Sequence, residues 1–430
     1  MGSRILVLAV TALAALIVGC GGGDTPGGGQ ESEGSDATKN AKAVDPASAD
    51  SAKGDVNWCI GKDTSGTFGP AVKKFNKENP DLKAKLSELP EAADEQRTQL
   101  VQRQRAKSPE CDVLGLDVIW TAEFAAQGWI SDLTDALGER EDEFIASTVD
   151  SARYADKLWA YPYNTNAGFL YYRTDKGGKP AENWEDVYKT AGEEDGIVYQ
   201  GAPYEGLTVN FLELLYSSGG KVLSEDGKTV EIGSPEAKEV MKFMADGVEE
   251  GAAPKAVTTY KEEEARRAFE AGKATYMRNW PYAYSLANEA DLKDKFEITT
   301  FPAFGEGEGA GVLGGYNLAV SAFSENPGGA LKLIDFLTSL EEQNTRQIEG
   351  STPATVAASY DDEKVKKAIP FAADLKKAVE QAQPRPVSPV YPLISEAIFK
   401  NTHDALTGEQ EPDAAVDKMA SEIEKAIATF

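Results

Sequence analysis

The chain has few of the residues that most often carry chemistry in proteins. Its 430 residues include one histidine, His403, and three cysteines, at positions 20, 59 and 111. With a single imidazole and no Cys-x-x-Cys pair, the sequence disfavours zinc sites and histidine-based catalysis. It also contains neither G-x-x-x-x-G-K-[ST] nor H-E-x-x-H. We therefore expect no cofactor and no metal site.

Basic residues are scarce beside acidic ones. The chain has 44 Lys and Arg against 71 Asp and Glu, a formal net charge of −27. Such a field repels nucleic acid and anionic lipid surfaces and favours solubility. We therefore expect no nucleic-acid partner, and strongly anionic ligands are disfavoured.

Long apolar runs are also rare. The first 20 residues hold a single Arg4, an apolar run from Ile5 to Val18, and then Gly19-Cys20. The run is short for a transmembrane helix and ends in small residues, so residues 1–19 are predicted to be a secretory signal peptide. The end of this run resembles a bacterial lipobox, which implies that Cys20 is lipidated. The alternative is a plain signal peptide with an incidental cysteine.

Residues 21–54 are rich in Gly, Ser, Asp and Ala and have almost no large apolar side chains. Such a composition buries too little surface to fold, so we interpret 20–54 as a lipidated cysteine followed by a flexible tether. An anchor and a tether would hold the folded body at the extracytoplasmic face of a bacterial cell membrane. We expect membrane contact through this lipid anchor only.

The two remaining cysteines, Cys59 and Cys111, both lie in short apolar runs. An extracytoplasmic location permits disulfides. If the two runs are neighbouring strands of one sheet, a Cys59–Cys111 bridge can form. Two buried free thiols are the alternative.

The body of the chain, from about residue 55, is long enough for two lobes. Apolar runs at 56–60 and 113–116 and the alternation of Leu82, Ala84 and Leu86 predict strands, and helical patterns over 68–79 and 91–107 separate them. This β-α-β-α-β order indicates a parallel sheet with helical crossovers. A G-x-G-x-x-G match at 309–314 enters a strand instead of opening a helix, so it is not a dinucleotide motif.

A carboxylate, Asp117, follows the third predicted strand, and an aromatic residue, Trp120, comes soon after. Ligands of open α/β sheets bind outside the carboxyl ends of the strands. Thr121 is placed to N-cap a short helix, with Glu123 in its first turn. Asp117 is therefore either a hydroxyl acceptor for a polyol or merely a turn cap, and Trp120 is either a ligand contact or core.

Further loops carry aromatic rings, side-chain amides, carboxylates and arginine. Rings can cover the apolar C–H face of a sugar, and the polar groups can hydrogen-bond its hydroxyls. Each residue also has a plainer interpretation, because Trp280 and Tyr282 could be core and Arg385 could form a surface ion pair. The candidate ligand-binding residues are Thr64, Ser65, Asp117, Asn164, Asn166, Glu205, Trp280, Tyr282, Gly315, Tyr316 and Arg385.

From about residue 55 to 430 the chain resembles the extracellular sugar-binding proteins (family 1) of bacterial ABC importers, and most closely their trehalose/maltose-binding branch. The resemblance is carried, in order, by Leu116 to Phe124 with Gly128-Trp129, Asn164 to Arg173, Tyr204 to Thr208, Met277 to Tyr282, and Pro384-Arg385-Pro386. It implies an α/β, two-lobed clamshell of the type II periplasmic-binding-protein kind, in which each lobe is a mainly parallel sheet flanked by helices. The expected lobes are 55–162 with 302–355 and 163–301 with 356–430, joined by a multi-strand hinge near 161–165, 299–304 and 350–361.

The resemblance also implies a function without catalysis. In that family the residues in the places of Asp117, Trp280 and Arg385 contact the sugar, and lobe closure buries it. We expect a monomeric substrate-binding lipoprotein that captures a trehalose- or maltose-type disaccharide and delivers it to the transmembrane subunits of an ABC permease. Asn164 and Asn166 stand where thermophilic relatives carry an aromatic residue and an aspartate, so the identity of the disaccharide stays open.

Two other classes of protein remain as alternatives. A secreted glycoside hydrolase would use a pair of carboxylates in an aromatic cleft, and this acidic chain has carboxylates in excess. A purely adhesive surface lipoprotein would bind no small molecule.

Overall fold

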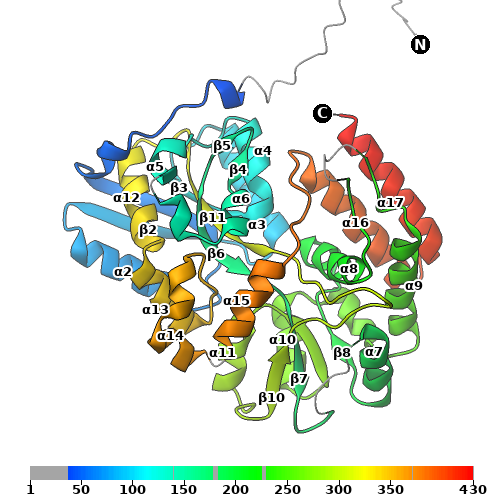
Figure 1. Cartoon of the computed structure of the whole chain (residues 1–430). Helices are drawn as coiled ribbons and strands as arrows, with labels where there is room; N and C mark the ends of the chain where they lie inside the picture. Colours follow the sequence, from blue (N-terminus) through cyan, green and yellow to red (C-terminus); the bar gives the residue numbers. More distant parts are fainter. Residues whose placement is uncertain (1–36, 139, 178–182, 225–228, 370, 430) are drawn as a thin grey trace, which may run out of the picture.

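The structure is a computed structural model that describes residues 37–138, 140–177, 183–224, 229–369 and 371–429. Two lobes lie beside each other, each with its own sheet, and helices cover both (Figure 1). Cys20 and the predicted signal peptide lie outside the described residues.

The first lobe contains a five-stranded sheet in the order β2-β1-β3-β11-β6. These strands are β2 (Leu82–Leu89), β1 (Gly54–Gly61), β3 (Val113–Asp117), β11 (Gly314–Val320) and β6 (Tyr161–Asn166). β1 pairs in parallel with β2 and with β3, as the β-α-β-α-β pattern predicts. β11 enters from much later in the chain and runs antiparallel to both of its neighbours.

The second lobe contains a four-stranded sheet in the order β10-β7-β9-β8. Its strands are β10 (Phe296–Thr299), β7 (Phe169–Arg173), β9 (Tyr276–Asn279) and β8 (Ile197–Val198). β7 runs against its neighbours, whereas β8 and β9 are parallel. In each sheet one strand therefore opposes the rest. The expected α/β architecture is confirmed, but both sheets are mixed, because the opposing strand lies between two antiparallel neighbours in each.

Helices flank the first sheet and join it to the second lobe. The first-lobe elements are η1 (Pro46–Ala49), α2 (Phe68–Glu78), α3 (Ala93–Arg105), η2 (Val118–Trp120), α4 (Thr121–Ala126), α5 (Thr134–Gly138), η3 (Glu141–Glu143), α6 (Ala146–Asp150), the small hairpin β4 (Arg153–Tyr154) and β5 (Lys157–Leu158), and α12 (Pro327–Leu337). α13 (Leu340–Gly350), η5 (Ala357–Asp361), α14 (Glu363–Ala368) and α15 (Ala372–Gln381) follow along the lower side in Figure 1.

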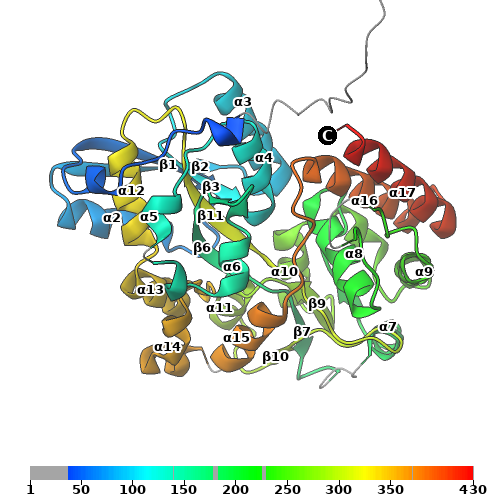
Figure 2. The same ribbon diagram turned by 45° about the horizontal axis from the view of Figure 1, so that its top comes forward.

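The helices of the second lobe surround its sheet. They are α7 (Trp184–Glu193), α8 (Glu205–Ser217), α9 (Pro235–Glu249), η4 (Lys255–Thr259), α10 (Glu262–Glu270), α11 (Tyr282–Glu289), α16 (Tyr391–Leu406) and α17 (Pro412–Ile427). Figure 2 shows α16 and α17 beside α8 and α9, although the two pairs are far apart in sequence. The hairpin that we expected at 226–227 lies outside the described residues.

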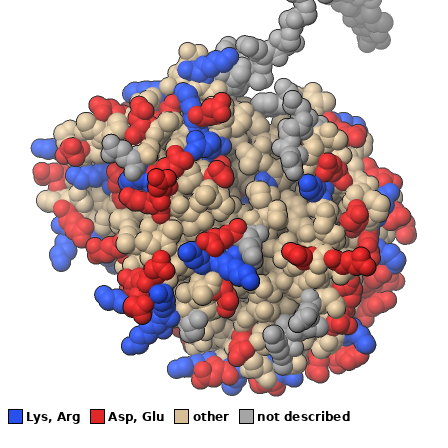
Figure 3. Space-filling model, in the orientation of Figure 1, with Lys and Arg blue, Asp and Glu red and all other residues tan. Residues whose placement is uncertain are grey.

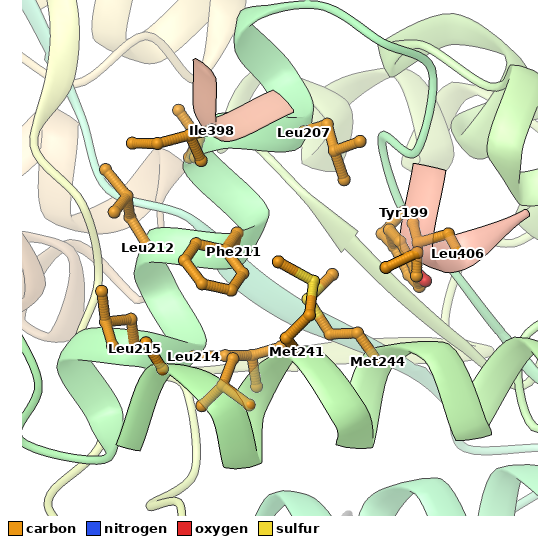
Figure 4. Close-up of a cluster of buried hydrophobic side chains, with 14 of the residues drawn as sticks. Tyr199, Leu207, Phe211, Leu212, Leu214, Leu215, Met241, Met244, Ile398 and Leu406 are labelled. Carbon is orange, nitrogen blue, oxygen red and sulfur yellow. The ribbon is translucent and has the colours of Figure 1, made fainter. Parts of the chain in front are cut away.

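The core of the second lobe is built around α8. Its apolar residues include Leu207, Phe211 and Leu212, all fully buried, and they pack against Met241 of α9 and Ile398 of α16 (Figure 4). A helix that is apolar on nearly every side is expected to be buried. Burial of each such side chain contributes about 1.5–3 kcal/mol to the stability of the folded state. α8 is therefore held firmly, and so is its first residue, Glu205.

Part of the predicted tether is folded against the first lobe, so that prediction is wrong for residues 37–54. Val44 is 5% exposed and joins the first-lobe core. Its N–H donates to the carbonyl of Asp132, and the N–H of Asp132 donates to the carbonyl of Lys42, each over 3.1 Å. Backbone pairing of this kind needs no apolar side chains. Composition alone therefore missed it.

The predicted disulfide is present. Cys59 in β1 and Cys111, just before β3, are bonded with their Cα atoms 5.7 Å apart. The two strands are neighbours in the sheet, as the sequence required for a bridge.

The proposed division into lobes meets one complication, at β6. The strand pairs with β11 from Tyr161 to Asn166, so the expected boundary at 162 falls within a first-sheet strand. The chain passes between the two sheets just beyond it, from β6 to β7, and again between β10 and β11. The hinge positions remain predictions.

Candidate functional site

A cleft lined by residues of both lobes collects the candidate residues. Its walls come from the ends of β1, β3, β6 and β11 and from α3 on one side, and from the start of α8 and the end of β9 on the other. The structure brings together all of the predicted ligand-binding residues there: Thr64, Ser65, Asp117, Asn164, Asn166, Glu205, Trp280, Tyr282, Gly315, Tyr316 and Arg385. These residues lie as much as 321 positions apart in the sequence.

At the centre of the cleft Arg385 joins two carboxylates. Its Nη2 donates to Oδ1 of Asp117 over 2.8 Å, and its Nη1 donates to Oε1 of Glu205 over 2.7 Å. The Arg385 side chain is 2% exposed. Since Asp117 ends β3 and Glu205 begins α8, this arginine bridges the two lobes. The interpretation of Arg385 as a surface ion pair is wrong, because the pair is buried.

Glu205 is the most constrained acid of the cleft. Besides Arg385, its carboxylate accepts hydrogen bonds from the hydroxyls of Tyr391 (2.7 Å) and Ser395 (2.5 Å). Burial raises the pKa of Glu205 to about 7, in spite of the opposing effect of the Arg385 cation, and nearby Asp117 adds to the rise. The protonation of Glu205 therefore changes near neutral pH.

Asp117 is the turn cap that we considered, and its role as a hydroxyl acceptor for a ligand stays a prediction. It accepts a hydrogen bond from the Ile119 N–H over 3.3 Å and so caps η2, and it also faces the cleft beside Arg385. Burial raises the pKa of Asp117, whereas the charge of Arg385 opposes the rise. Trp120 is 2% exposed and belongs to the core. Thr121 is the first residue of α4 and makes no cap, so that prediction is wrong.

The aromatic side chains of the cleft are held by neighbours. The Tyr316 hydroxyl donates to Oε1 of Gln96 over 2.9 Å, and the Tyr282 hydroxyl donates to Glu263 over 3.1 Å. Trp280 lies against the guanidinium of Arg278. All three rings are partly exposed and none is fully core, which leaves part of each available to a ligand.

Some polar side chains that line the cleft already form hydrogen bonds within the protein. Ser65 bonds with Asp63 (2.8 Å) and Thr67 (2.7 Å), which fixes the loop that also carries Thr64. Oδ1 of Asn164 accepts from the Tyr316 N–H over 3.1 Å, so this amide is partly engaged in the sheet.

Gly315 contributes its backbone and not a side chain. Its φ is +122°, and a Cβ at this position would lie 2.2 Å from the carbonyl oxygen of Asn164. A glycine is therefore required where β11 passes β6 at the cleft.

Several lining residues were not predicted from the sequence. Gln96 on α3 is one, and it also donates to the backbone carbonyl of Glu91 over 2.9 Å. The sequence held a signal for it, because the helix over 91–107 is polar on nearly every side and yet crosses between buried strands. The other missed polar residues are Lys62, Glu91, Glu262 and Thr352.

The described residues contain no group of three or more His, Cys, Asp or Glu side chains placed to hold a metal ion. Among the same residues, no helix combines the length and the apolar character needed to cross a bilayer. Acidic and basic side chains are interspersed on the face shown in Figure 3, and acidic ones predominate along its right-hand edge.

Comparisons with known proteins agree with this architecture. The chain is 36% identical to maltose-bound MalE3 of T. maritima, with a TM-score of 0.83 over 86% of this chain and 99% of that one. It is 33% identical to a probable ABC transporter-binding protein of Deinococcus radiodurans, over 79% of this chain and 85% of the relative. The GacH receptor of Streptomyces glaucescens, at 23% identity and a TM-score of 0.80, shares the fold.

These neighbours confirm the predicted two-lobed clamshell of the type II periplasmic kind. The family model for bacterial extracellular solute-binding proteins matches residues 61–344. That span includes β2, β3, β6 and β11 of the first sheet and all of the predicted ligand-binding residues except Arg385. The chain therefore belongs to the family of bacterial extracellular solute-binding proteins.

Proposed function

We propose that this chain is the substrate-binding component of an ABC sugar importer and captures a disaccharide of the trehalose or maltose type between its lobes. The observation that carries the proposal is the cleft, where rings from both lobes face buried carboxylates, an arginine and side-chain amides. This combination suits a neutral polyol with an apolar ring face. The maltose in the T. maritima structure, at 36% identity, supports the choice of ligand class.

The mechanism follows from the arrangement of the cleft. Asp117 and Tyr316 lie on the first lobe, and Glu205 and Trp280 lie on the second. A sugar that contacts all four stabilises the closed arrangement of the lobes over an open one, because only the closed form makes both sets of contacts. The closed, loaded protein would then deliver the sugar to the transmembrane subunits of the permease. No covalent bond is made or broken.

The remaining parts of the proposal concern location and assembly. Cys20 would carry the lipid, and the residues that follow it would tether the folded body to the membrane. The protein would act as a monomer at the extracytoplasmic face of the membrane, which fits a family of extracellular binding proteins. Replacement Cys20→Ser should release the protein from the membrane fraction into the medium, and continued membrane association would contradict the anchor.

The ligand is tested by calorimetry with maltose, trehalose and sucrose. We expect an α-linked disaccharide to bind, and Trp280→Ala and Asp117→Ala each to weaken the binding at least tenfold. Asp132→Ala is a matched control, because Asp117 and Asp132 are both 9% exposed, and both cap a turn and pair with a cation. Only Asp117 lines the cleft. Binding of no sugar would contradict the proposal.

The same samples test the hydrolase alternative. A binding protein returns its disaccharide unchanged, whereas a hydrolase releases glucose continuously. Sustained glucose release from maltose or trehalose would overturn the proposal of a binding role.

A further inference from the structure

The side of Trp280 that faces the protein is covered by a buried cation. The Cζ atom of Arg278 lies 4.0 Å from the centre of the Trp280 ring. Arg278 is 2% exposed and does not line the cleft, whereas Trp280 does. A guanidinium stacks on an indole through its flat face. The orientation of the ring is therefore coupled to the orientation of the guanidinium plane.

That plane is itself fixed. The Nε atom of Arg278 donates to Oε2 of Glu213 over 2.7 Å, its Nη2 donates to Oε1 of the same carboxylate, and its Nη1 donates to Oε1 of Gln200 over 3.0 Å. Glu213 is 1% exposed and sits on α8, the most buried helix of the second lobe. A bidentate pair with a third in-plane partner leaves the guanidinium little freedom to turn. Its hydrogen bonds lie in the plane of the guanidinium, so the Trp280 ring contacts the flat face of that plane.

The space around this pair is also restricted. A Cβ on Gly168 would lie 2.5 Å from Oε1 of Glu213 and 2.8 Å from Nη2 of Arg278, so only glycine fits there. A Cβ on Gly314, across in the first lobe, would lie 3.1 Å from the Trp280 ring. The ring thus lies between a fixed guanidinium and the edge of β11.

The backbone of Trp280 is anchored as well. Its N–H donates to Oδ1 of Asn279 over 2.8 Å, and its carbonyl accepts from the Tyr171 hydroxyl over 2.7 Å. These bonds fix the main chain but leave the two side-chain torsions of the tryptophan free. The guanidinium restricts them, together with the second-lobe core against which Trp280 packs and the β11 backbone at Gly314.

We propose that Arg278, held by Glu213, is a positioning residue that sets the plane of Trp280 for the apolar face of a sugar. A buried ion pair is weak evidence for stability, since apolar replacements of similar volume are often as stable. A planar cation that three hydrogen bonds hold against the tryptophan of the cleft has a use that an apolar pair would lack. This inference rests on the proposed sugar-binding function.

The test is a double-mutant cycle on maltose affinity in the mature protein. Arg278→Lys keeps a positive charge facing Glu213 but removes the planar surface. We expect it to raise the Kd for maltose about tenfold when Trp280 is present and less than about twofold in a Trp280→Ala background. A purely structural role would raise the Kd by the same factor in both backgrounds, and that result would overturn the proposal, as would an unchanged Kd in the first.

Arg173→Lys is the matched control. Arg173 also lies in the second sheet, is buried, and forms a bidentate pair, with Asp175 at 2.7 Å for both bonds, but it lies outside the cleft. We expect its Kd to equal that of the parent. If Arg278→Lys does not fold, the double replacement Arg278→Met with Glu213→Gln removes the ion pair as a unit, and the same comparison applies.

A second readout needs no ligand. The near-ultraviolet circular dichroism of Trp280, taken as the parent spectrum minus that of Trp280→Phe, should shrink in Arg278→Lys, because a ring free to turn loses its fixed asymmetric surroundings. An unchanged band would overturn the positioning role. A parent protein that binds no maltose would instead contradict the proposed function, so the two failures are distinguishable.

Discussion

Replacing Arg385 by methionine should destabilise the protein strongly at alkaline pH and much less at acidic pH. The guanidinium is the shared partner of Asp117 and Glu205, at 2.8 Å and 2.7 Å, and all three are buried. Removing one member of a buried ionic group costs about 3–5 kcal/mol, because the partners are left charged and unpaired. We expect a loss of that size in the free energy of unfolding at pH 8.

The pH dependence follows from the two acids. Burial already raises the pKa of Asp117, and that of Glu205 to about 7; without the arginine, both should rise further. An acid whose pKa is higher in the folded state than in the unfolded state holds its proton more tightly when folded. Its stabilising effect is complete below the unfolded pKa and is lost as the pH rises through the folded one. At pH 5 Glu205 is neutral in the variant, and the raised pKa of Asp117 lessens the charge left unpaired, so the loss should fall towards about 1–2 kcal/mol, the cost of broken hydrogen bonds.

The assay is urea unfolding of Arg385→Met and the parent at pH 5 and pH 8, followed by far-ultraviolet circular dichroism. Arg153→Met is the control, since Arg153 forms an exposed pair with Glu141 at 2.6 Å, and such pairs contribute about 0–1 kcal/mol. Equal losses at the two pH values, or a loss below about 1 kcal/mol at pH 8, would refute the electrostatic reasoning.

Three further predictions concern the disulfide, Glu205 and Gly315. The double replacement Cys59→Ala with Cys111→Ala should lower the free energy of unfolding by about 4 kcal/mol, because the bridge closes a long loop over 52 positions; a loss under 1 kcal/mol in urea would contradict this. Between pH 4.5 and pH 7.5 the free energy of unfolding of Glu205→Gln should rise relative to that of the parent by up to about 3 kcal/mol. The reason is that Glu205, with a folded pKa of about 7, stabilises the parent in its protonated form and loses that proton over this range, whereas glutamine does not titrate. A difference in the free energy of unfolding that stays constant with pH would argue against this. Gly315→Ala, which combines a φ of +122° with a steric clash, should lower the melting temperature and weaken sugar binding, whereas Gly69→Ala, with open space around its Cβ, should do neither.

Much of the fold could be predicted because its signals are local. The strands β1 and β3 each contain a short apolar run, β2 shows an alternation of apolar and polar residues, and the helix between β1 and β2 has its own apolar periodicity. The cap of α7 by Asn183 and the Pro235 start of α9 could also be recognised from a few neighbouring residues. Such features depend on sequence neighbours alone.

The residues that line the cleft were predicted from the sequence, but the hydrogen bonds and ion pairs between them were not. Aromatic and polar residues at strand ends identified the lining of the cleft, yet the pairing of Asp117 with Arg385 joins positions 268 apart. No local pattern encodes such a contact. The burial of Arg278 could not be predicted for the same reason. A charged residue in a strand is most often exposed. Arg278 is buried because it pairs with Glu213, a buried residue on a helix far away in the sequence. Val44 is the converse case, since one buried side chain and a backbone pairing hold a segment whose composition indicates disorder.

A sugar can bind in the cleft without breaking the ion pairs of Arg385 with Asp117 and Glu205. The structure gives Asp117 two donors, the Ile119 N–H and Arg385, whereas an ionised carboxylate offers about four acceptor sites. Sugar hydroxyls can therefore bind to Asp117 without displacing the arginine, and the buried cation never has to be left unpaired. In the closed form Arg385 is bonded to a carboxylate on each lobe, so it would keep the two walls of the cleft in register while the ligand adds contacts to both. On this account Arg385→Lys, which cannot reach two carboxylates with one planar group, should weaken sugar binding more than it weakens the fold. Calorimetry and urea unfolding on the same preparation would show this, and equal effects on the two free energies would contradict it.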